Sequence, residues 1–338
     1  MKMALFFEKL KDNKVACRLC NHFCVILDGH VGFCGVRKNI GGQLFTLTYG
    51  NLVAAHVDPI EKKPFYHFMP GSISFSIATA GCNFRCDFCQ NYEISQRNAE
   101  QILERRETSP EQVVRQAIAA RCASISYTYT EPTIFMEYAL DCAKLAKEKG
   151  LYNNFVTNGF MSQEALDAVA PYLDAANVDV KGNHQFYKQV CRGKLDPVLE
   201  NIRTMKERGI WVEVTTLLIP DRNDDRQTFL LLAEKLLAIS SDIPWHFSRF
   251  FPTYRMQDHY ATPQDTIWRA REEALKMGFR YVYTGNMPGN EGENTACPGC
   301  RNVIIRRQGF SVYDIKMKGN RCGFCGFEIA GVFSASHS

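Results

Sequence analysis

The stretch "SISFSIATAGCNFRCDFC" (residues 72–89) joins a β-rich run to a loop that opens at a glycine and carries three cysteines. The run 72–79 predicts a strand, and Cys82, Cys86 and Cys89 follow it at C-x3-C-x2-C spacing. Four thiolates saturate the irons of a [4Fe-4S] cluster, whereas three leave one iron open for a substrate or cofactor. The spacing therefore predicts a chemically active cluster. The alternative is a zinc site, or packed cysteines, with a fourth ligand elsewhere.

The chain around this stretch alternates strand and helix patterns. The segment "SPEQVVRQAIAARC" (109–122) predicts a helix with Ser109 as N-cap and Pro110 at the first helical position. The next strand is expected at 123–129 and the next helix at 133–150. Further strands are expected at 153–157, 174–180, 210–219, 245–251 and 280–285, and helices near 162–170, 196–208, 224–238 and 263–277.

This α/β alternation predicts a full or partial (β/α) TIM-type barrel rather than an open nucleotide-binding sheet. Neither G-x-G-x-x-G nor G-x4-G-K-[ST] occurs, which argues against nicotinamide and P-loop sites. In a barrel the chemistry belongs at the carboxyl ends of the strands, where the cysteine loop would lie.

The composition of the chain indicates in which cellular compartment the protein works and which partners it lacks. The 338 residues carry a net charge of +4, which does not by itself argue for nucleic acid or a membrane surface. No apolar run is long enough to cross a bilayer, and the first residues are too charged for a secretory signal. We therefore expect a cytoplasmic protein without a membrane partner. Its 14 cysteines would stay reduced there, which favours metal ligation over disulfides.

The motif "CNFRCDFC" (82–89) resembles the signature of radical S-adenosylmethionine (SAM) enzymes, including the aromatic residue before the last cysteine. In that family the open iron binds the methionine part of SAM. One electron then breaks the sulfonium C–S bond, and the 5'-deoxyadenosyl radical abstracts a hydrogen atom. The resemblance implies a radical SAM oxidoreductase with a [4Fe-4S] cluster on the three cysteines, SAM as cofactor, and a flavodoxin- or ferredoxin-type electron donor.

The segment "YTYTEPT" (127–133) resembles the Gly-Gly-Glu-Pro turn of the same family, with Tyr129 and Thr130 in place of the glycines. The resemblance implies that Tyr129 and Thr130 contact SAM through their backbone and that Glu131 receives the methionine ammonium of SAM. The alternative is that Glu131 stabilises the start of the helix near Thr133, since carboxylates are favourable at helix N-termini.

Three more segments, "VTNGF" (156–160), "VDVKG" (178–182) and "WHFSRF" (245–250), recur in the glycyl-radical (pyruvate formate-lyase) activating-enzyme branch. There they bind the methionine carboxylate and the ribose, which implies SAM contacts from Asn158, Asp179, Lys181 and His246. The alternatives are a tight Asn-Gly turn, a simple Asp179–Lys181 pair and a packed strand histidine.

Cys191 in "KQVCRGKLDPV" (188–198) follows the fourth expected strand. It is a candidate catalytic residue, because a thiol at the barrel mouth could donate a hydrogen atom or form a substrate adduct. The alternative is a small buried hydrophobe.

The whole chain resembles the radical SAM component of the AmmeMemoRadiSam system, through segments 50–72 and 284–300 as well as its N-terminal cysteines. This resemblance implies partners with AMMECR-type and Memo domains. We expect three parts: a Cys-rich N-terminal extension (1–70), a radical SAM barrel (71–290) and a C-terminal metal module (291–338). The charged loop 58–68 would cover the pocket, bind a partner or be solvated.

Two further cysteine sets flank the expected barrel. The first, at C-x2-C-x3-C-x9-C spacing, predicts one metal site, either zinc or an auxiliary iron-sulfur cluster; its asymmetry favours the cluster. The second has two C-x2-C knuckles and predicts a zinc-ribbon or rubredoxin-like site with zinc or iron. The first set is Cys17, Cys20, Cys24 and Cys34, and the second is Cys297, Cys300, Cys322 and Cys325.

Two classes of function follow. The first is a radical SAM enzyme that abstracts hydrogen from a protein glycine, a peptide or a small molecule. The second is a non-enzymatic iron-sulfur and zinc module that acts as a redox sensor or a nucleic-acid adaptor. The basic C-terminal module keeps nucleic acid open, although a solvated basic face is favoured. The complete cysteine triad favours the enzyme.

Overall fold

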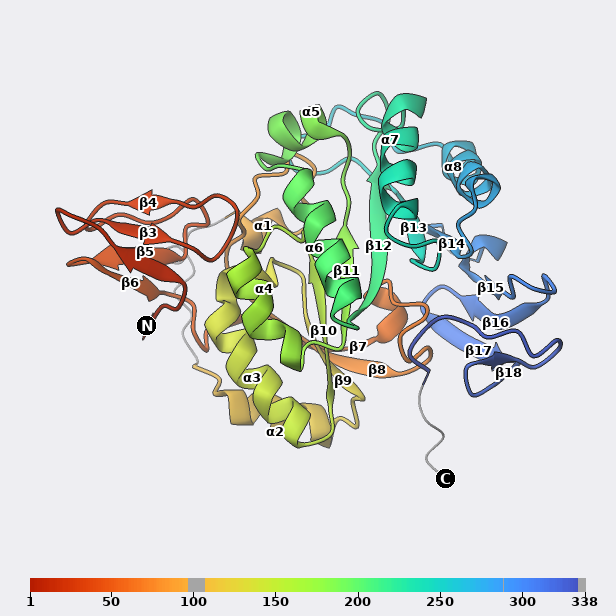
Figure 1. Ribbon diagram of the computed structural model, residues 1–338, viewed down its shortest axis with the longest axis horizontal. Helices are drawn as coiled ribbons and strands as arrows, with labels where there is room; N and C mark the ends of the chain where they lie inside the picture. Colours follow the sequence, from red (N-terminus) through yellow and green to blue (C-terminus); the bar gives the residue numbers. More distant parts are fainter. Residues whose placement is uncertain (97–106, 288, 334–338) are drawn as a thin grey trace.

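The structure is a computed structural model that describes residues 1–96, 107–287 and 289–333. Its centre is an eight-stranded sheet in the order β14-β13-β12-β11-β10-β9-β8-β7 (Figure 1). Strands β8 to β14 are parallel, and β7 pairs antiparallel with β8. The strands are β7 (Leu52–Pro59), β8 (Ile73–Thr79), β9 (Ser124–Tyr127), β10 (Tyr152–Thr157), β11 (Ala175–Asp179), β12 (Trp211–Leu218), β13 (Trp245–Arg249) and β14 (Val282–Gly285).

The long helices connect these strands and lie along one side of the sheet (Figure 1). They are α2 (Pro110–Ala119), α3 (Met136–Glu148), α4 (Gln163–Val169), α6 (Asp196–Glu207), α7 (Arg226–Leu237) and α8 (Gln264–Met277). The short helices are α1 (Tyr92–Ser95) and α5 (His184–Phe186). Helix α2 begins as its sequence predicts, because the Ser109 side chain accepts from the Gln112 N–H in a capping box.

The expected strands and helices of the α/β region are thus confirmed within a few residues at each end. The barrel is not closed: β7 and β14 are the two edges of the described sheet. Strand β7 was not expected. Seven of its eight residues are exposed or partly exposed, and it is a strand because it pairs with β8. It places residues 52–59, which fall within the expected N-terminal extension (1–70), in the central sheet.

Alternation along the strands gives the sheet two different faces. Apolar residues such as Phe75, Ile125 and Val178 are buried in the core with the helices. On the opposite face lie polar residues such as Ser126, which donates to the Asn154 side chain at 2.7 Å. The helix-covered face therefore stabilises the fold, and the other face is free for a polar site.

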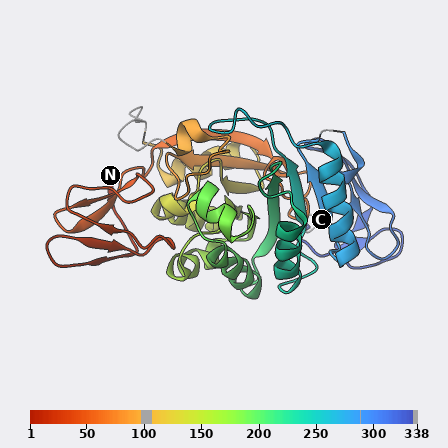
Figure 2. The same ribbon diagram turned by 90° about the horizontal axis from the view of Figure 1, so that it is seen from above.

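Small β-modules sit at opposite ends of the molecule (Figures 1 and 2). The N-terminal module consists of β1 (Lys2–Met3), β2 (Phe7–Lys9), β3 (Val15–Cys17), β4 (Val25–Ile26), β5 (Arg37–Ile40) and β6 (Gln43–Thr46). The C-terminal module consists of β15 (Thr295–Ala296), β16 (Val303–Gln308), β17 (Ser311–Ile315), β18 (Met317–Lys318) and β19 (Arg321–Cys322). Residues 334–338 of the expected C-terminal part lie outside the described residues.

The loop between β7 and β8 is buried rather than solvated. The Glu213 carboxylate accepts from the backbone N–H groups of Tyr66 and His67 at 2.8–3.1 Å. Glu61 forms a buried ion pair with Arg307 of the C-terminal module at 3.5 Å. Arg307 is thus not part of a solvated basic face, and the loop fastens the C-terminal module to the sheet.

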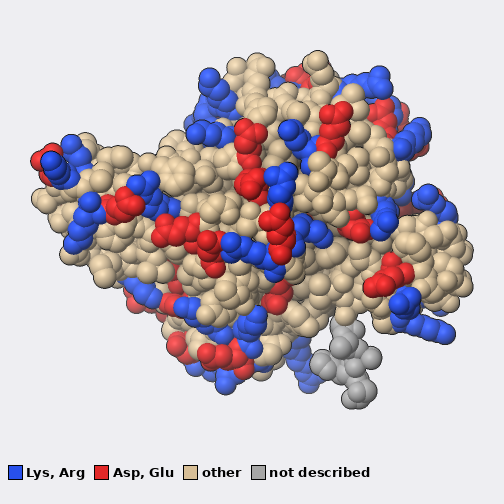
Figure 3. Space-filling model, in the orientation of Figure 1, with Lys and Arg blue, Asp and Glu red and all other residues tan. Residues whose placement is uncertain are grey.

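The surface shows no strong bias of charge on the face drawn in Figure 3, where Lys and Arg are interspersed with Asp and Glu. Among the helices of the described ranges, none combines the length and apolarity needed to span a membrane.

Candidate active site

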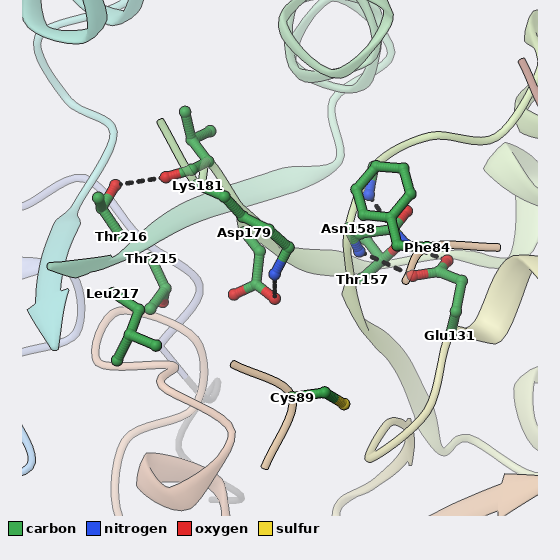
Figure 4. A network of polar contacts seen from close by, with 12 residues as sticks. Phe84, Cys89, Glu131, Thr157, Asn158, Asp179, Lys181, Thr215, Thr216 and Leu217 are labelled. Atoms are coloured by element: carbon green, nitrogen blue, oxygen red, sulfur yellow. Dashed lines mark hydrogen bonds and ion pairs between the residues drawn. The ribbon is translucent and has the colours of Figure 1, made fainter. Parts of the chain in front are cut away.

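A cavity of about 460 Å³ opens at the carboxyl ends of the parallel strands. Cys82, Cys86 and Cys89 line it. Six of the seven residues expected to contact SAM line it as well: Tyr129, Thr130, Glu131, Asn158, Asp179 and Lys181. Figure 4 shows Cys89 facing Asp179 and Glu131 across this space. The volume is in the range of small-molecule sites.

The cysteine loop is fixed by the backbone of the segment that follows β11. Arg85 N donates to the Cys191 carbonyl at 2.9 Å, and Asp87 N donates to Val190 at 3.2 Å. Cys82 Sγ accepts from Phe84 N at 3.3 Å. Burial raises the pKa of Cys82 well above its usual range, so metal binding at this loop would have to displace protons.

Glu131 is buried and accepts from four donors. Its Oε1 accepts from Thr133 N (3.0 Å), Thr133 Oγ1 (2.5 Å) and Thr157 Oγ1 (2.7 Å). Among the described residues, its Oε2 accepts only from Asn158 N, at 2.8 Å. Burial raises the pKa of Glu131. The carboxylate therefore caps the helical turn at Pro132–Phe135, as the alternative interpretation expected, and Oε2 still has acceptor capacity toward the cavity.

Tyr129 adopts the backbone conformation that glycine usually supplies. Its φ is +62°, which is uncommon and strained for a tyrosine. Asn91 Nδ2 donates to its carbonyl at 2.8 Å, and its hydroxyl donates to Asp58. Lys63 Nζ lies 4.1 Å from the ring centre. These contacts hold the turn in a backbone conformation that glycine usually supplies.

Asp179 and Lys181 form an ion pair at 2.7 Å on the cavity wall (Figure 4). Although burial opposes it, the Asp179 carboxylate raises the pKa of Lys181 well above its usual range. The electrostatic interaction with Cys86 raises the pKa of Lys181 as well. Asp179 and Lys181 thus pair with each other, as the alternative interpretation expected. The pair presents one anion and one cation to the cavity.

His246 does not line the cavity. Its Nε2 lies 2.7 Å from Glu213 Oε2, and its ring packs against Tyr66 and Tyr283. Ser248, two residues further along β13, lines the cavity instead. Because strand side chains alternate, His246 occupies the same face one layer deeper. Its contact with SAM stays a prediction without geometric support.

Cys191 is fully buried at the end of a π-helical turn (Tyr187–Cys191) and is not part of the cavity lining. It contacts the Cys86 thiol, and this contact together with burial raises the pKa of Cys86. Its catalytic role stays a prediction.

The sequence analysis missed several cavity residues. Lys63 is 2% exposed, and its Nζ lies 2.8 Å from Asp58 Oδ2. Burial lowers the pKa of Lys63 to about 8. Thr157 and Thr215 also line the cavity. Thr157 ends the predicted strand 153–157, so strand position was the available signal for it. Thr215 lies within β12 and Lys63 in a loop, and nothing local marked either residue.

The C-terminal cysteines form a compact group. The ligand atoms of Cys297, Cys300, Cys322 and Cys325 all lie within 4.8 Å of one another. The Sγ atoms are 3.6 Å apart for Cys297–Cys325 and 3.7 Å for Cys300–Cys322. A tetrahedral zinc with Zn–S bonds of about 2.3 Å places its sulfurs about 3.8 Å apart. The donor set fits one zinc or iron ion.

Comparison with known proteins gives three findings. The model of the Radical SAM superfamily matches residues 76–233. The Methanocaldococcus jannaschii protein MJ0808 is 45% identical over 97% of this chain and 99% of its own length. A second protein of that organism, MJ1632, is provisionally named a glycyl-radical enzyme activating enzyme. It is 26% identical over 61% of this chain and 78% of its own length.

Among solved structures, a radical SAM methyltransferase from Sphaerobacter thermophilus resembles this fold with a TM-score of 0.52 and 16% identity. The match covers 67% of this chain and 71% of that one. At this identity the likeness concerns the fold alone.

Proposed function

Because this chain belongs to the radical SAM superfamily and is an enzyme that reductively cleaves SAM, we propose that Cys82, Cys86 and Cys89 hold its [4Fe-4S] cluster. The observation that carries the proposal is the shared cavity, which brings these cysteines together with six expected SAM-binding residues. When bound, the cluster supplies the electron that splits SAM into methionine and a 5'-deoxyadenosyl radical.

The donor set fits this group. Three thiols face one cavity, and the described lining adds no fourth cysteine. Three thiolates leave one iron open. Glu131 Oε2 would accept the methionine ammonium there, since Asn158 N is its only other partner in the part of the chain that the structure describes. Lys181 would pair with the methionine carboxylate and Asp179 with the ribose hydroxyls.

The protein would also control the reactivity of the bound nucleotide. Phe84 and Phe88 line the cavity, and both side chains are buried. Apolar walls exclude water and protect a reactive intermediate from side reactions. The strained turn at Tyr129 would present backbone groups to SAM at a fixed position.

The substrate is a hydrogen donor that reaches the cavity: a protein glycine, a peptide or a small molecule. The likeness to a protein provisionally named a glycyl-radical activating enzyme supports the first. The proposal includes partners with AMMECR-type and Memo domains. It also includes a flavodoxin- or ferredoxin-type protein as the electron donor that radical SAM enzymes need. A cytoplasmic location remains a prediction.

The test is anaerobic reconstitution with iron and sulfide, followed by dithionite and SAM. We expect 5'-deoxyadenosine from the natural protein and from a Cys122→Ala control, which removes a buried thiol outside all three cysteine sets. Cys86→Ala should give none above background. Equal product from Cys86→Ala and Cys122→Ala would contradict the assignment.

The hydrogen donor can be found by deuterating candidate substrates, because the 5'-deoxyadenosyl radical takes its hydrogen atom from the substrate. With the true substrate, the 5'-deoxyadenosine formed should carry one deuterium. A glycine in a partner protein should also give a glycyl-radical doublet in its EPR spectrum. Deuterium transfer from a small molecule without that doublet would exclude the protein glycine.

A further inference from the structure

The four N-terminal cysteines face one small pocket. Cys17, Cys20, Cys24 and Cys34 all line it. They also interact electrostatically with one another, Cys20 with each of the other three. Three of them are buried, and burial raises the pKa of Cys34 to about 11. The rest of the wall is mostly apolar: Leu19, Ile26, Phe33 and Ile134. Buried thiols converging on an apolar pocket form a ligand set rather than scattered packing residues.

The spacing of these sulfurs differs from that of the C-terminal set. Among the described residues, only the C-terminal cysteines bring three or more ligand atoms within 4.8 Å of one another. The N-terminal cysteines share a pocket without such close contact, and so do the three cysteines of the SAM cavity. One ion draws its sulfurs to about 3.8 Å, whereas a cluster holds each sulfur on a separate iron.

A buried cation faces the same pocket. Arg37 is 1% exposed, lines the pocket and interacts electrostatically with Cys17 and Cys34. Its Nη1 bonds to Glu137 at 2.8 Å, and its buried Nε has no partner within residues 1–96, 107–287 and 289–333. A positive charge with a free N–H donor beside thiolates offsets the negative charge of a cluster and can bond to one of its sulfurs.

The pocket lies directly against the loop of the SAM cavity. A Cβ on Gly81 would meet the Cys34 carbonyl oxygen at 3.0 Å, which places the Cα atoms of Cys34 and Cys82 within about 11 Å. His22, on the pocket wall, has Nε2 2.6 Å from the Asn83 carbonyl oxygen. Arg85 donates to the carbonyl of Phe33. The two cysteine loops are therefore in contact.

From these observations we propose that Cys17, Cys20, Cys24 and Cys34 hold a second [4Fe-4S] cluster, which passes electrons to the cluster in the SAM cavity. One electron enters from a low-potential donor protein, which is oxidised by one electron, and the same electron leaves toward the SAM cluster. No bond forms or breaks at the second site, because four cysteines saturate it. The relay role rests on the proposed function, whereas the second site does not.

The experiment compares three forms of the full chain after anaerobic loading with iron and sulfide: the natural protein, Cys82→Ala/Cys86→Ala/Cys89→Ala, and Cys20→Ala/Cys34→Ala. Acid-labile sulfide is the main readout, because neither zinc nor a single iron carries it. We expect each variant to keep about half of the sulfide of the natural protein.

EPR of the dithionite-reduced proteins assigns the two clusters. In the Cys82→Ala/Cys86→Ala/Cys89→Ala variant, added SAM should leave the signal unchanged, since every iron has a cysteine ligand. In Cys20→Ala/Cys34→Ala, SAM should alter the signal. If Cys82→Ala/Cys86→Ala/Cys89→Ala contains no sulfide, the second cluster is overturned while the proposed function stands. If SAM has no effect on the EPR signal of Cys20→Ala/Cys34→Ala, the proposed function is contradicted instead.

The relay has its own readout. With dithionite, which reduces clusters directly, Cys20→Ala/Cys34→Ala should form 5'-deoxyadenosine at a rate close to natural. With reduced flavodoxin it should lose most of that rate. The relay is overturned if Cys20→Ala/Cys34→Ala loses the same share of the rate with both reductants. It is also overturned if the variant loses no rate with either reductant. The Cys82→Ala/Cys86→Ala/Cys89→Ala variant keeps all four N-terminal cysteines, so its sulfide content decides the second site even if Cys20→Ala/Cys34→Ala folds poorly.

Discussion

The two ends of the molecule each carry four cysteines, but in different surroundings. At the C-terminus the sulfurs are 3.6–3.7 Å apart in their pairs, and Cys325 is exposed. At the N-terminus they line an apolar pocket against the cysteine loop of the cavity. The comparison teaches that the number of ligands does not decide the role of a metal site. Spacing, burial and neighbours do.

The reason lies in what each module packs against. The C-terminal module packs into a small core separate from the main one. In it Cys297, Cys322, Ile304 and Ile305 are buried together with Tyr66, Tyr281 and Tyr283 of the central part. A closed tetrahedral site supplies the folding free energy that so few apolar residues cannot. The N-terminal module instead shares the main core, with Val15 and Leu44 in it. It therefore depends less on its metal for folding.

The largest expected effect tests this difference directly. Cys322→Ser should abolish metal binding at the C-terminal site and open residues 295–333, because structural zinc contributes on the order of 10 kcal/mol to small domains. Metal analysis and hydrogen exchange of that segment would measure the change. Cys122→Ser is the matched control. A variant that loses metal yet keeps its exchange protection would break the comparison.

The next effect concerns the ion pair at the N-terminal site. Arg37→Met leaves Glu137 buried without its cation, which should lower the free energy of unfolding by about 3–5 kcal/mol. Urea unfolding of the anaerobic protein measures it. The double variant Arg37→Met/Glu137→Gln should recover much of the loss. A single variant as stable as the natural protein would show that the pair does not support this module.

A smaller effect with a defined pH dependence is expected at the C-terminal junction. Burial lowers the pKa of His67 to about 4, so the folded protein keeps the ring neutral where the unfolded chain is protonated. The free energy of unfolding should therefore fall as pH drops from about 6.5 to about 4, by about 3 kcal/mol in total.

In the neutral ring, His67 Nδ1 donates to the Ala330 carbonyl and Nε2 accepts from the Tyr283 hydroxyl, so this loss should appear as release of the C-terminal module. Chemical unfolding at several pH values measures it as the difference between the natural protein and His67→Gln. The exposed His30→Gln variant should keep the natural slope. An identical slope in His67→Gln would refute the assignment.

The smallest effect is expected on the surface of the same module. Arg321 and Glu328 are 3.7 Å apart, with side chains 60% and 64% exposed. Exposed ion pairs contribute less than about 1 kcal/mol, so Arg321→Ala should hardly change the midpoint of thermal unfolding. A loss as large as that of Arg37→Met would mean that surface charge, and not the metal, stabilises the module.

Local patterns predicted the α/β region well. The cap at Ser109, the apolar alternation of β8 and the cysteine spacing each depend on neighbours in sequence. The edge strand β7 escaped prediction because pairing with β8, not its own apolar pattern, makes it a strand. For the loop 58–68 the sequence left three alternatives open: covering the pocket, binding a partner or being solvated. Its burial around Tyr66 depends on Glu213, which is distant in sequence and binds its backbone.

The features of the candidate site also fall into those that local sequence predicts and those that depend on distant segments. Sequence by itself determined the order of strands and helices and the three sets of cysteines, because helix caps, strand alternation and ligand spacing are local properties of the chain. Only the tertiary structure decided the depth of His246, the glycine-like turn at Tyr129 and the contact between the N-terminal pocket and the cavity loop. These depend on strand register and on packing between distant segments, which no local pattern encodes.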